Sequence, residues 1–299
     1  MLKQIEGSHA VAHVVAQCRP HVISAYPITP QTHIVEELAD IVGAGQLDAE
    51  FVNVESEFSA ASVVLGASAA GARAYTATSS QGLLLMSEVI YCIAGMRLPI
   101  VLTCANRAIS APLSIWNDQQ DSMAVRDAGW IQLHAEDNQE ASDLHIQAFK
   151  IAEQTFLPVM VCMDGFILTH AYEPVDIPEQ KEVDDFLPAF KPKHIVDPRW
   201  PRGIGLFADP RFYMETRYIL HRALEKSEDT KKEVSSEFAK AFGRASGGFI
   251  KTYKLEEAEV VVISMGSVVG TIKELIDQLE EKGKKVGLLQ ICSYRPFPR

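Results

Sequence analysis

Cysteine is scarce in this sequence, and no two cysteines lie close together. The 299 residues contain five of them, scattered singly through apolar segments: Cys18, Cys92, Cys104, Cys162 and Cys292. Without a C-x-x-C pair or a ferredoxin-like run, the chain cannot ligate an iron–sulfur cluster by itself. We interpret the five as buried thiols of a protein in a reducing compartment, the cytoplasm.

Metal-ligand spacing is also missing among the nine histidines. His9 and His13 are four residues apart on a predicted helix, but the sequence offers no third ligand beside them. The spacing therefore predicts no metal site in this chain.

Positive charge is in short supply. The chain has 28 basic residues against 39 acidic ones, a net charge of -11, and no basic stripe. This balance argues against a nucleic-acid partner. No apolar run reaches the roughly 18 residues that span a bilayer, and the N-terminus MLKQIEGSHA lacks the apolar core of a signal peptide. We therefore expect a soluble cytoplasmic protein with no membrane partner.

Several common sequence signatures are missing too. No G-x-G-x-x-G follows a predicted strand, and the sequence has neither a G-x-x-x-x-G-K-[ST] loop nor a nucleophile elbow. These absences argue against a dinucleotide-binding dehydrogenase and against a P-loop enzyme.

What the sequence does contain is a regular alternation of strands and helices. Strands are predicted at 22–25, 51–54, 73–78, 100–104, 131–134 and 159–162, and helices between them at 31–41, 56–70, 81–94 and 139–153, the last capped by Asn138. Because these strands are apolar throughout, we expect an α/β fold with a doubly wound parallel sheet covered on both faces.

The amino-acid composition and the hydrophobic periodicity change after residue 174. Prolines and acidic residues up to about 211 predict a long connector, followed by a polar helix at 213–242. A strand at 259–264, a helix at 268–281 and a strand at 285–290 then form a βαβ unit, the start of a second α/β domain. We expect one domain over residues 1–250 and an incomplete second one over 255–299.

Polar residues follow several of these strands. The turn YPITP at 26–30 leaves one hydroxyl, Thr29, between two prolines, and Pro30 is expected to begin the next helix. The turn suits a buried ligand, although an ordinary Pro-capped connection explains it equally well. Glu55 and Glu57 begin a helix of small residues, where acids also simply complement the helix dipole. We favour that surface interpretation for Glu55, and for Glu57 a partly desolvated carboxyl that contacts a ligand.

Two further segments carry candidate binding groups. The hydroxyls of TSSQG at 78–82 lie at a strand end, where Ser79 or Ser80 could equally cap the next helix. Arg107, just past the strand at 100–104, can grip a carboxylate with two parallel hydrogen bonds, and the loop carrying Trp116 can close over it. An ion pair between Arg107 and a nearby aspartate, at 118 or 121, is the structural alternative.

Six blocks in this order resemble a known family. They are YPITP at 26–30, SE at 56–57 before a helix of small residues, TSSQG at 78–82, NRAI at 106–109 followed by LSIWND, MDGF at 163–166 and YRPF at 294–297. The whole chain resembles the alpha subunit of the 2-oxoacid:ferredoxin oxidoreductases, most closely the pyruvate enzymes. The resemblance implies that residues 1–250 bind the pyrimidine of thiamine diphosphate and that 255–299 begin a transketolase C-terminal-like domain.

The resemblance also implies roles for individual residues. Glu57 becomes the catalytic acid that hydrogen-bonds the N1′ atom of the cofactor's pyrimidine ring, and Thr29 and Arg107 become the residues that hold the 2-oxoacid. Cofactor contacts are implied for a small set of residues: Pro27, Ile28, Glu57, Ser79 and Ser80. The implied reaction is the reversible oxidative decarboxylation of pyruvate to acetyl-CoA and CO₂, with electrons passed to ferredoxin.

Partner chains complete this implied enzyme. The resemblance implies beta, gamma and delta type subunits in a dimer of heteromers, with Mg²⁺ and the [4Fe-4S] clusters in those subunits and ferredoxin docking there. Thiamine diphosphate is expected to be shared with the beta subunit, because the G-D-G…N pattern that binds its diphosphate is absent here. Two alternatives stay open: a branched 2-oxoacid such as 2-oxoisovalerate as the substrate, or a non-catalytic assembly subunit with the same fold.

Overall fold

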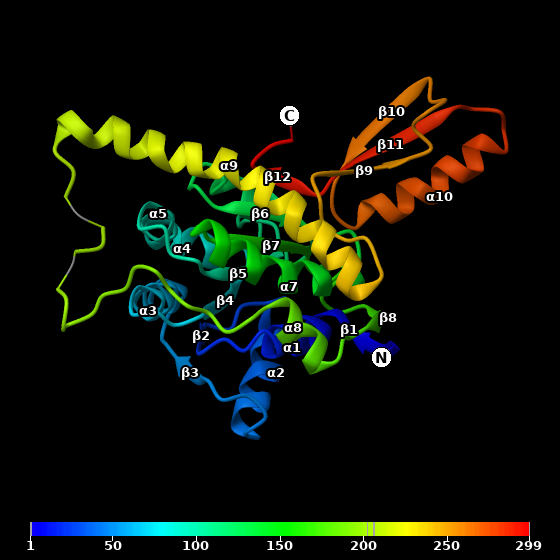
Figure 1. Ribbon diagram of the computed structural model, residues 1–299. Helices are drawn as coiled ribbons and strands as arrows, with labels where there is room; N and C mark the ends of the chain where they lie inside the picture. The colour runs from blue at the N-terminus through cyan, green and yellow to red at the C-terminus, as the bar shows by residue number, and fades with distance from the viewer. Residues whose placement is uncertain (1, 202, 206, 299) are drawn as a thin grey trace.

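A seven-stranded sheet forms the centre of the molecule (Figure 1), with the strand order β12-β6-β7-β5-β4-β2-β3. This computed structural model describes residues 2–201, 203–205 and 207–298. The strands of the sheet are β2 (Val22–Ala25), β3 (Glu50–Asn53), β4 (Ala74–Thr78), β5 (Val101–Asn106), β6 (Ile131–His134), β7 (Val159–Asp164) and β12 (Ser293–Arg295).

The sheet is parallel apart from its edge strand β12, which runs antiparallel to β6. Every residue of β4, β5, β6 and β7 is buried, as expected for strands covered on both faces. The predicted doubly wound α/β fold is therefore confirmed. Strand β12 was not predicted, because a segment of three residues is too short to show a pattern typical of a strand.

Helices cover the two faces. The helices of the described residues, of which α10 packs on the smaller sheet described below, are α1 (Gly7–Gln17), α2 (Thr32–Gly43), α3 (Glu57–Ala69), α4 (Ser80–Leu85), α5 (Ser87–Gly95), α6 (Gln120–Ala124), α7 (Asn138–Thr155), α8 (Gln180–Phe186), α9 (Pro210–Phe242) and α10 (Val268–Glu280). Helix α1 packs between α2 and α7, whereas α3 packs on β2 and β4 and reaches α5. In the described part of the chain, no helix combines the length and apolar character that crossing a membrane requires.

Three local details differ from the sequence-based predictions. The helix predicted at 81–94 is two helices, α4 and α5, joined at Met86. Helix α7 is capped by Asp137, whose carboxylate accepts a hydrogen bond from the Glu140 N–H (2.7 Å), and not by Asn138. The segment after residue 174 is more ordered than predicted, because α8 and part of β8 (Tyr172–Asp176) lie in it, and β8 pairs with β1 (Leu2–Glu6).

A second, smaller sheet follows α9. Strands β10 (Val260–Ser264) and β11 (Val286–Ile291) are parallel and joined by α10, which confirms the predicted βαβ unit. Strand β9 (Ile250–Tyr253) adds an antiparallel third strand on the other side of β11. The division of the chain into domains near residues 250–255 stays a prediction.

Polar contacts fasten the second sheet to the first. Asp164, at the end of β7, accepts hydrogen bonds from the backbone N–H (2.8 Å) and the hydroxyl (2.6 Å) of Ser267, just before α10. Glu136 lies 2.9 Å from Lys251 on β9 and 2.6 Å from Lys273 on α10. The smaller sheet therefore lies beside the carboxyl ends of β6 and β7 (Figure 1).

Candidate functional site

The order in which the chain adds strands to the sheet reverses between β2 and β4. The chain runs outward from β2 to β3 and then returns to β4 on the other side of β2. Strands β2 and β4 are paired only at Val22–Ala74 and Ile23–Tyr75, and beyond this point the Gln31 side chain donates to the carbonyl of Ala77 (2.7 Å). A topological switch point of this kind is where open α/β sheets bind their ligands.

The 26–30 turn lies directly over this point. Buried Gln31 anchors it, while Pro27 and Thr29 are exposed and Ile28 is half-buried. Helix α2 begins at Thr32, so Pro30 belongs to the turn and does not begin the helix. The turn therefore presents the Thr29 hydroxyl outward at the edge of the sheet.

Glu57 is the first residue of α3 and is buried, with 7% of its surface exposed. Its carboxylate lies against Gly82 of α4: a Cβ atom at position 82 would stand 2.7 Å from Glu57 Oε1 and 2.5 Å from Thr78 Oγ1. Glycine at this position therefore makes room for the acid. Among the described residues, none donates a hydrogen bond to this carboxylate.

Glu55 differs from Glu57 in its surroundings. It is exposed, and its carboxylate accepts a hydrogen bond from the Ser59 hydroxyl, which lowers the pKa of Glu55. The surface interpretation of Glu55 is therefore supported.

The hydroxyls at the end of β4 do not cap α4. Ser79 is the N-cap residue, but its side chain makes no capping hydrogen bond, and Ser80 Oγ donates instead to the carbonyl of Ala108 (2.6 Å). Thr78 Oγ1 and Ser79 Oγ are buried without a partner in the described part of the chain. The capping interpretation is wrong, and two buried hydroxyls beside Glu57 are left unsatisfied.

Arg107 reaches the 26–30 turn. Its Nη1 donates to the backbone carbonyl of Thr29 (2.7 Å), its Nε to the carbonyl of Ser114 (3.1 Å), and its Nη2 to Gln81 Oε1 (3.2 Å). No carboxylate of a described residue forms an ion pair with it, so the predicted alternative of an ion pair with a nearby aspartate is wrong. Burial lowers the pKa of Arg107. Its charge is available to an anion.

Asp121 organises the loops around this arginine, and sequence reasoning missed this role. The fully buried carboxylate accepts hydrogen bonds from the backbone N–H groups of Ser80 (2.9 Å), Arg107 (3.0 Å) and Ser122 (2.8 Å), and from Asn106 Nδ2 (2.7 Å). Burial raises the pKa of Asp121, and these hydrogen bonds oppose the rise. The spacing of residues along the sequence does not predict this role, because it depends on the three-dimensional meeting of the loops that carry Ser80, Arg107 and Asp121.

Asp121→Asn is expected to lower the free energy of unfolding of the chain. An amide presents a donor where the carboxylate accepted, and each buried N–H left unsatisfied costs about 1–3 kcal/mol. Urea unfolding followed by circular dichroism measures the change. The control is Asp118→Asn, at a partly exposed position where the side chain accepts one backbone N–H (2.7 Å), and we expect a change within about 0.5 kcal/mol there. Equal stability of the two variants would contradict this role of Asp121.

The loop after Arg107 carries Trp116 outward. Its ring is 59% exposed and lies 5.1 Å from the Phe166 ring, centroid to centroid. Closure of this loop over Arg107 stays a prediction. Other large apolar side chains are exposed on the loops and helices near this edge: Tyr26, Phe58, Leu85, Leu113, Ile115 and Ile167. Exposed apolar side chains in such number are typical of a surface that another chain covers.

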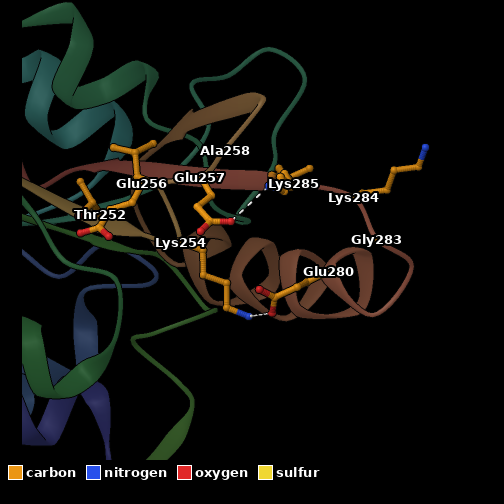
Figure 2. A pocket seen from close by; sticks show the side chains of 11 residues that line it. Thr252, Lys254, Glu256, Glu257, Ala258, Glu280, Gly283, Lys284 and Lys285 are labelled. Atoms are coloured by element: carbon orange, nitrogen blue, oxygen red, sulfur yellow. Dashed lines mark hydrogen bonds and ion pairs between the residues drawn. The ribbon is translucent and has the colours of Figure 1, made fainter.

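A hollow of about 460 Å³ lies elsewhere, at the ends of β10 and β11 farther from the first sheet (Figure 2). Four of its charged side chains form ion pairs, Lys254 with Glu280 (2.6 Å) and Lys285 with Glu257 (3.3 Å). None of the predicted site residues lines it. The residues that the sequence predicted as a site meet instead at the switch point of the larger sheet.

Comparison with known proteins identifies the family. A family model described as pyruvate flavodoxin/ferredoxin oxidoreductase, thiamine diphosphate-binding, matches residues 13–236, and one described as pyruvate:ferredoxin oxidoreductase core domain II matches residues 258–299. A solved 2-oxoglutarate:ferredoxin oxidoreductase from Magnetococcus marinus has the same fold, with a TM-score of 0.78 and 22% identity over 99% of this chain and 55% of its own.

Longer relatives, of which this chain spans about three quarters, share about half of the aligned residues with it. Pyruvate synthase subunit PorA of Methanosarcina barkeri is 54% identical over 99% of this chain and 74% of its own length. The PorA subunit of Methanothermobacter thermautotrophicus is 52% identical over 100% of this chain and 78% of its own. Ketoisovalerate oxidoreductase subunit VorA of Pyrococcus abyssi is 45% identical over 99% and 75%.

These matches confirm the resemblance that the six sequence blocks predicted. They extend over nearly the whole chain and include both sheets. The chain is a member of the pyruvate flavodoxin/ferredoxin oxidoreductase family, built as one subunit of a multi-subunit enzyme.

Proposed function

We propose that this chain is the alpha subunit of a pyruvate synthase, a pyruvate:ferredoxin oxidoreductase that acylates coenzyme A. The reaction converts pyruvate and coenzyme A to acetyl-CoA and CO₂, and two electrons pass to ferredoxin. The observation that carries the proposal is the switch-point site, where the buried acid Glu57 lies near Arg107, an arginine that forms no ion pair with any described residue and contacts the 26–30 turn. Pyruvate is favoured over 2-oxoisovalerate because identities to pyruvate synthase subunits reach 54%, against 45% for VorA.

The residues at the site fit the pyrimidine end of thiamine diphosphate. Glu57 has no hydrogen-bond donor among the described residues, and Thr78 Oγ1, Ser79 Oγ and Gln81 Nε2 are buried without partners. An aminopyrimidine offers donors and acceptors that such groups require. When bound, thiamine diphosphate supplies the carbon nucleophile and the electron sink that decarboxylation of a 2-oxoacid needs. Pro27, Ile28, Ser79 and Ser80 would hold the ring together with Glu57.

Glu57 acts as the catalytic acid in this proposal. Its carboxyl would hydrogen-bond the pyrimidine nitrogen N1′ of the bound cofactor and so promote the chemistry that thiamine diphosphate supplies. The apolar and small side chains of α3 exclude water around the carboxyl, since Ala60, Ala61 and Val64 are buried.

Arg107 and Thr29 hold the substrate. The guanidinium pairs with the carboxylate of the 2-oxoacid, a geometry in which arginine donates two parallel hydrogen bonds. Its present acceptors are two backbone carbonyls and one amide oxygen, which are neutral, so a carboxylate competes favourably for its donors. The Thr29 hydroxyl, exposed beside it, hydrogen-bonds the substrate.

Partner subunits complete the enzyme. A beta type subunit binds the diphosphate and Mg²⁺ and covers the apolar side chains exposed near the site. Gamma and delta type subunits carry the [4Fe-4S] clusters and dock ferredoxin. The five cysteines of this chain include one neighbouring pair, Cys104 and Cys162, and not the four gathered thiolates that a cluster needs. The whole forms a dimer of heteromers. Five free cysteines suit the reducing cytoplasm.

The isolated chain is expected to bind thiamine diphosphate weakly or not at all. It offers side chains for the pyrimidine, but the diphosphate and its Mg²⁺ depend on the partner. Isothermal titration calorimetry of the chain alone, compared with the co-expressed assembly, measures the difference. Micromolar binding by the chain without a partner would contradict the shared site.

The function itself is tested with the co-expressed subunits. We expect pyruvate with coenzyme A to reduce a viologen dye, with 2-oxoisovalerate and 2-oxoglutarate as the comparison substrates. Faster turnover of 2-oxoisovalerate than of pyruvate would identify the enzyme as a branched-chain 2-oxoacid:ferredoxin oxidoreductase. Absence of turnover with every 2-oxoacid, from an intact assembly with its cofactors, would leave the chain as a non-catalytic assembly subunit.

A further inference from the structure

A cluster of metal-ligating side chains lies on the N-terminal helices, apart from the site just described. Glu6 ends β1, His9 is in the first turn of α1, and His33 is in the first turn of α2. One donor atom of each lies within 4.8 Å of the donor atoms of the other two. We propose that these three side chains bind a first-row divalent cation, with Zn²⁺ as the best fit.

The packing of α1 against α2 brings the two histidines face to face. The rings of His9 and His33 are 6.1 Å apart, centroid to centroid. One turn further along the same two helices, His13 Nε2 lies 3.3 Å from Glu37 Oε1. The facing pairs are therefore equivalent in position, but only the first has a third ligand, Glu6, which comes from the strand before α1.

Glu6 makes this cluster more than a chance meeting of surface histidines. Its residue is 7% exposed, and its carboxylate oxygen Oε1 lies 2.6 Å from His33 Nδ1. A carboxylate and an imidazole at this distance form a hydrogen bond, and a metal ion can take the place of that hydrogen bond by binding both groups. The buried carboxylate supplies the negative charge that a divalent cation needs.

The ligand set suits Zn²⁺. Two imidazoles and one carboxylate form a familiar three-ligand zinc site, which leaves the fourth tetrahedral position to water. Donor atoms around a tetrahedral Zn²⁺ lie roughly 3.3 Å apart. The present separations reach 4.8 Å, and because His9 and His33 are only partly buried, rotation of their side chains can close the gap.

A neighbouring ring packs beside one of the ligands. The His170 ring lies 4.7 Å from the His33 ring, centroid to centroid, in a tilted arrangement. It stacks on the Phe166 ring at 4.3 Å, and its Nδ1 is hydrogen-bonded to Thr169 Oγ1 (2.8 Å). Through Phe166, whose ring also meets Trp116, the cluster connects to the loop beside Arg107.

The sequence alone predicted no metal site because it offered only His9 and His13 within one helix. The fold replaces His13 with a different pair of ligands: Glu6 lies three residues before His9, and His33 is contributed by the next helix. Only tertiary packing brings the third ligand close.

Calorimetric titration with ZnCl₂ tests the proposal on the full chain. The chain is first stripped with a chelator and kept reduced, and it carries Cys92→Ser because Cys92 is its one exposed thiol. We expect one Zn²⁺ per chain and an affinity at least tenfold weaker in both His33→Ala and Glu6→Gln. The matched control is His13→Ala, one turn away on α1, which should bind Zn²⁺ as the parent does.

Each other outcome overturns the proposal. No Zn²⁺ binding by the parent chain, or unchanged binding in both ligand variants, means that these side chains do not form a site. A loss in His13→Ala as large as in His33→Ala means that the ligand set is wrong. Circular dichroism verifies folding, and because the two ligand variants change different elements, one folded variant suffices. The readout is independent of turnover, so it does not depend on the proposed function.

Discussion

Replacing Glu57 by glutamine is expected to abolish turnover of the assembled enzyme while leaving the assembly intact. The amide has nearly the shape of the carboxyl, so the contact with Gly82 and the packing of α3 are kept. It cannot hold the ionisable proton that the pyrimidine nitrogen requires, and loss of a general acid costs typically 10²–10⁴-fold in rate. Viologen reduction by the co-expressed subunits with pyruvate and coenzyme A measures the effect.

The neighbouring acid provides the matched control. Glu55→Gln removes an exposed carboxylate two residues away, which accepts a hydrogen bond from the Ser59 hydroxyl. We expect this variant to turn over nearly as the parent does. Near-normal turnover of Glu57→Gln would remove Glu57 from the mechanism, and equal losses in both variants would indicate a general effect on this end of α3.

Arg107→Ala is expected to raise the KM for pyruvate. An uncompensated carboxylate costs roughly 2–5 kcal/mol when its buried partner is removed, which corresponds to about thirtyfold to several-thousandfold in affinity. Steady-state kinetics over a range of pyruvate concentrations separate this effect from a change in kcat. The KM for coenzyme A should change little.

Arg107 also braces the 26–30 turn through the carbonyl of Thr29, so the experiment needs a structural control. Thermal melting of the variant chain reports whether that bracing matters for stability. Arg126→Ala, which removes an exposed arginine that follows α6, should leave the KM unchanged. If Arg107→Ala keeps the parent KM, the arginine supports the loop and does not bind the substrate.

Much of the larger sheet could be predicted because its strands are short apolar runs between turn residues. The strands at 22–25 and 131–134 have the predicted bounds. The strands that were missed, β1, β8, β9 and β12, owe their existence to partners far away in the sequence. Strand β1, for example, is a largely exposed segment that becomes a strand only because β8 lies beside it.

The site was predictable to the extent that it follows strand ends. Thr29, Ser79 and Arg107 each come shortly after a parallel strand, and carboxyl ends of such strands meet at one edge. Which groups bind one another within the site could not be predicted. Asp121 stood in the sequence as a possible ion-pair partner for Arg107, yet its carboxylate accepts the backbone N–H of that residue instead. A buried acid that accepts hydrogen bonds from backbone N–H groups cannot be recognised from the spacing of residue types in the sequence.

The central claim is that this chain holds the pyrimidine of a thiamine cofactor through Glu57. The most direct test is a structure of the cofactor-loaded assembly, in which the distance from the Glu57 carboxylate to the ring nitrogen N1′ is measured. We predict a hydrogen-bond distance of roughly 2.6–3.2 Å. A carboxylate that faces solvent, beyond reach of any ring nitrogen, would contradict the account.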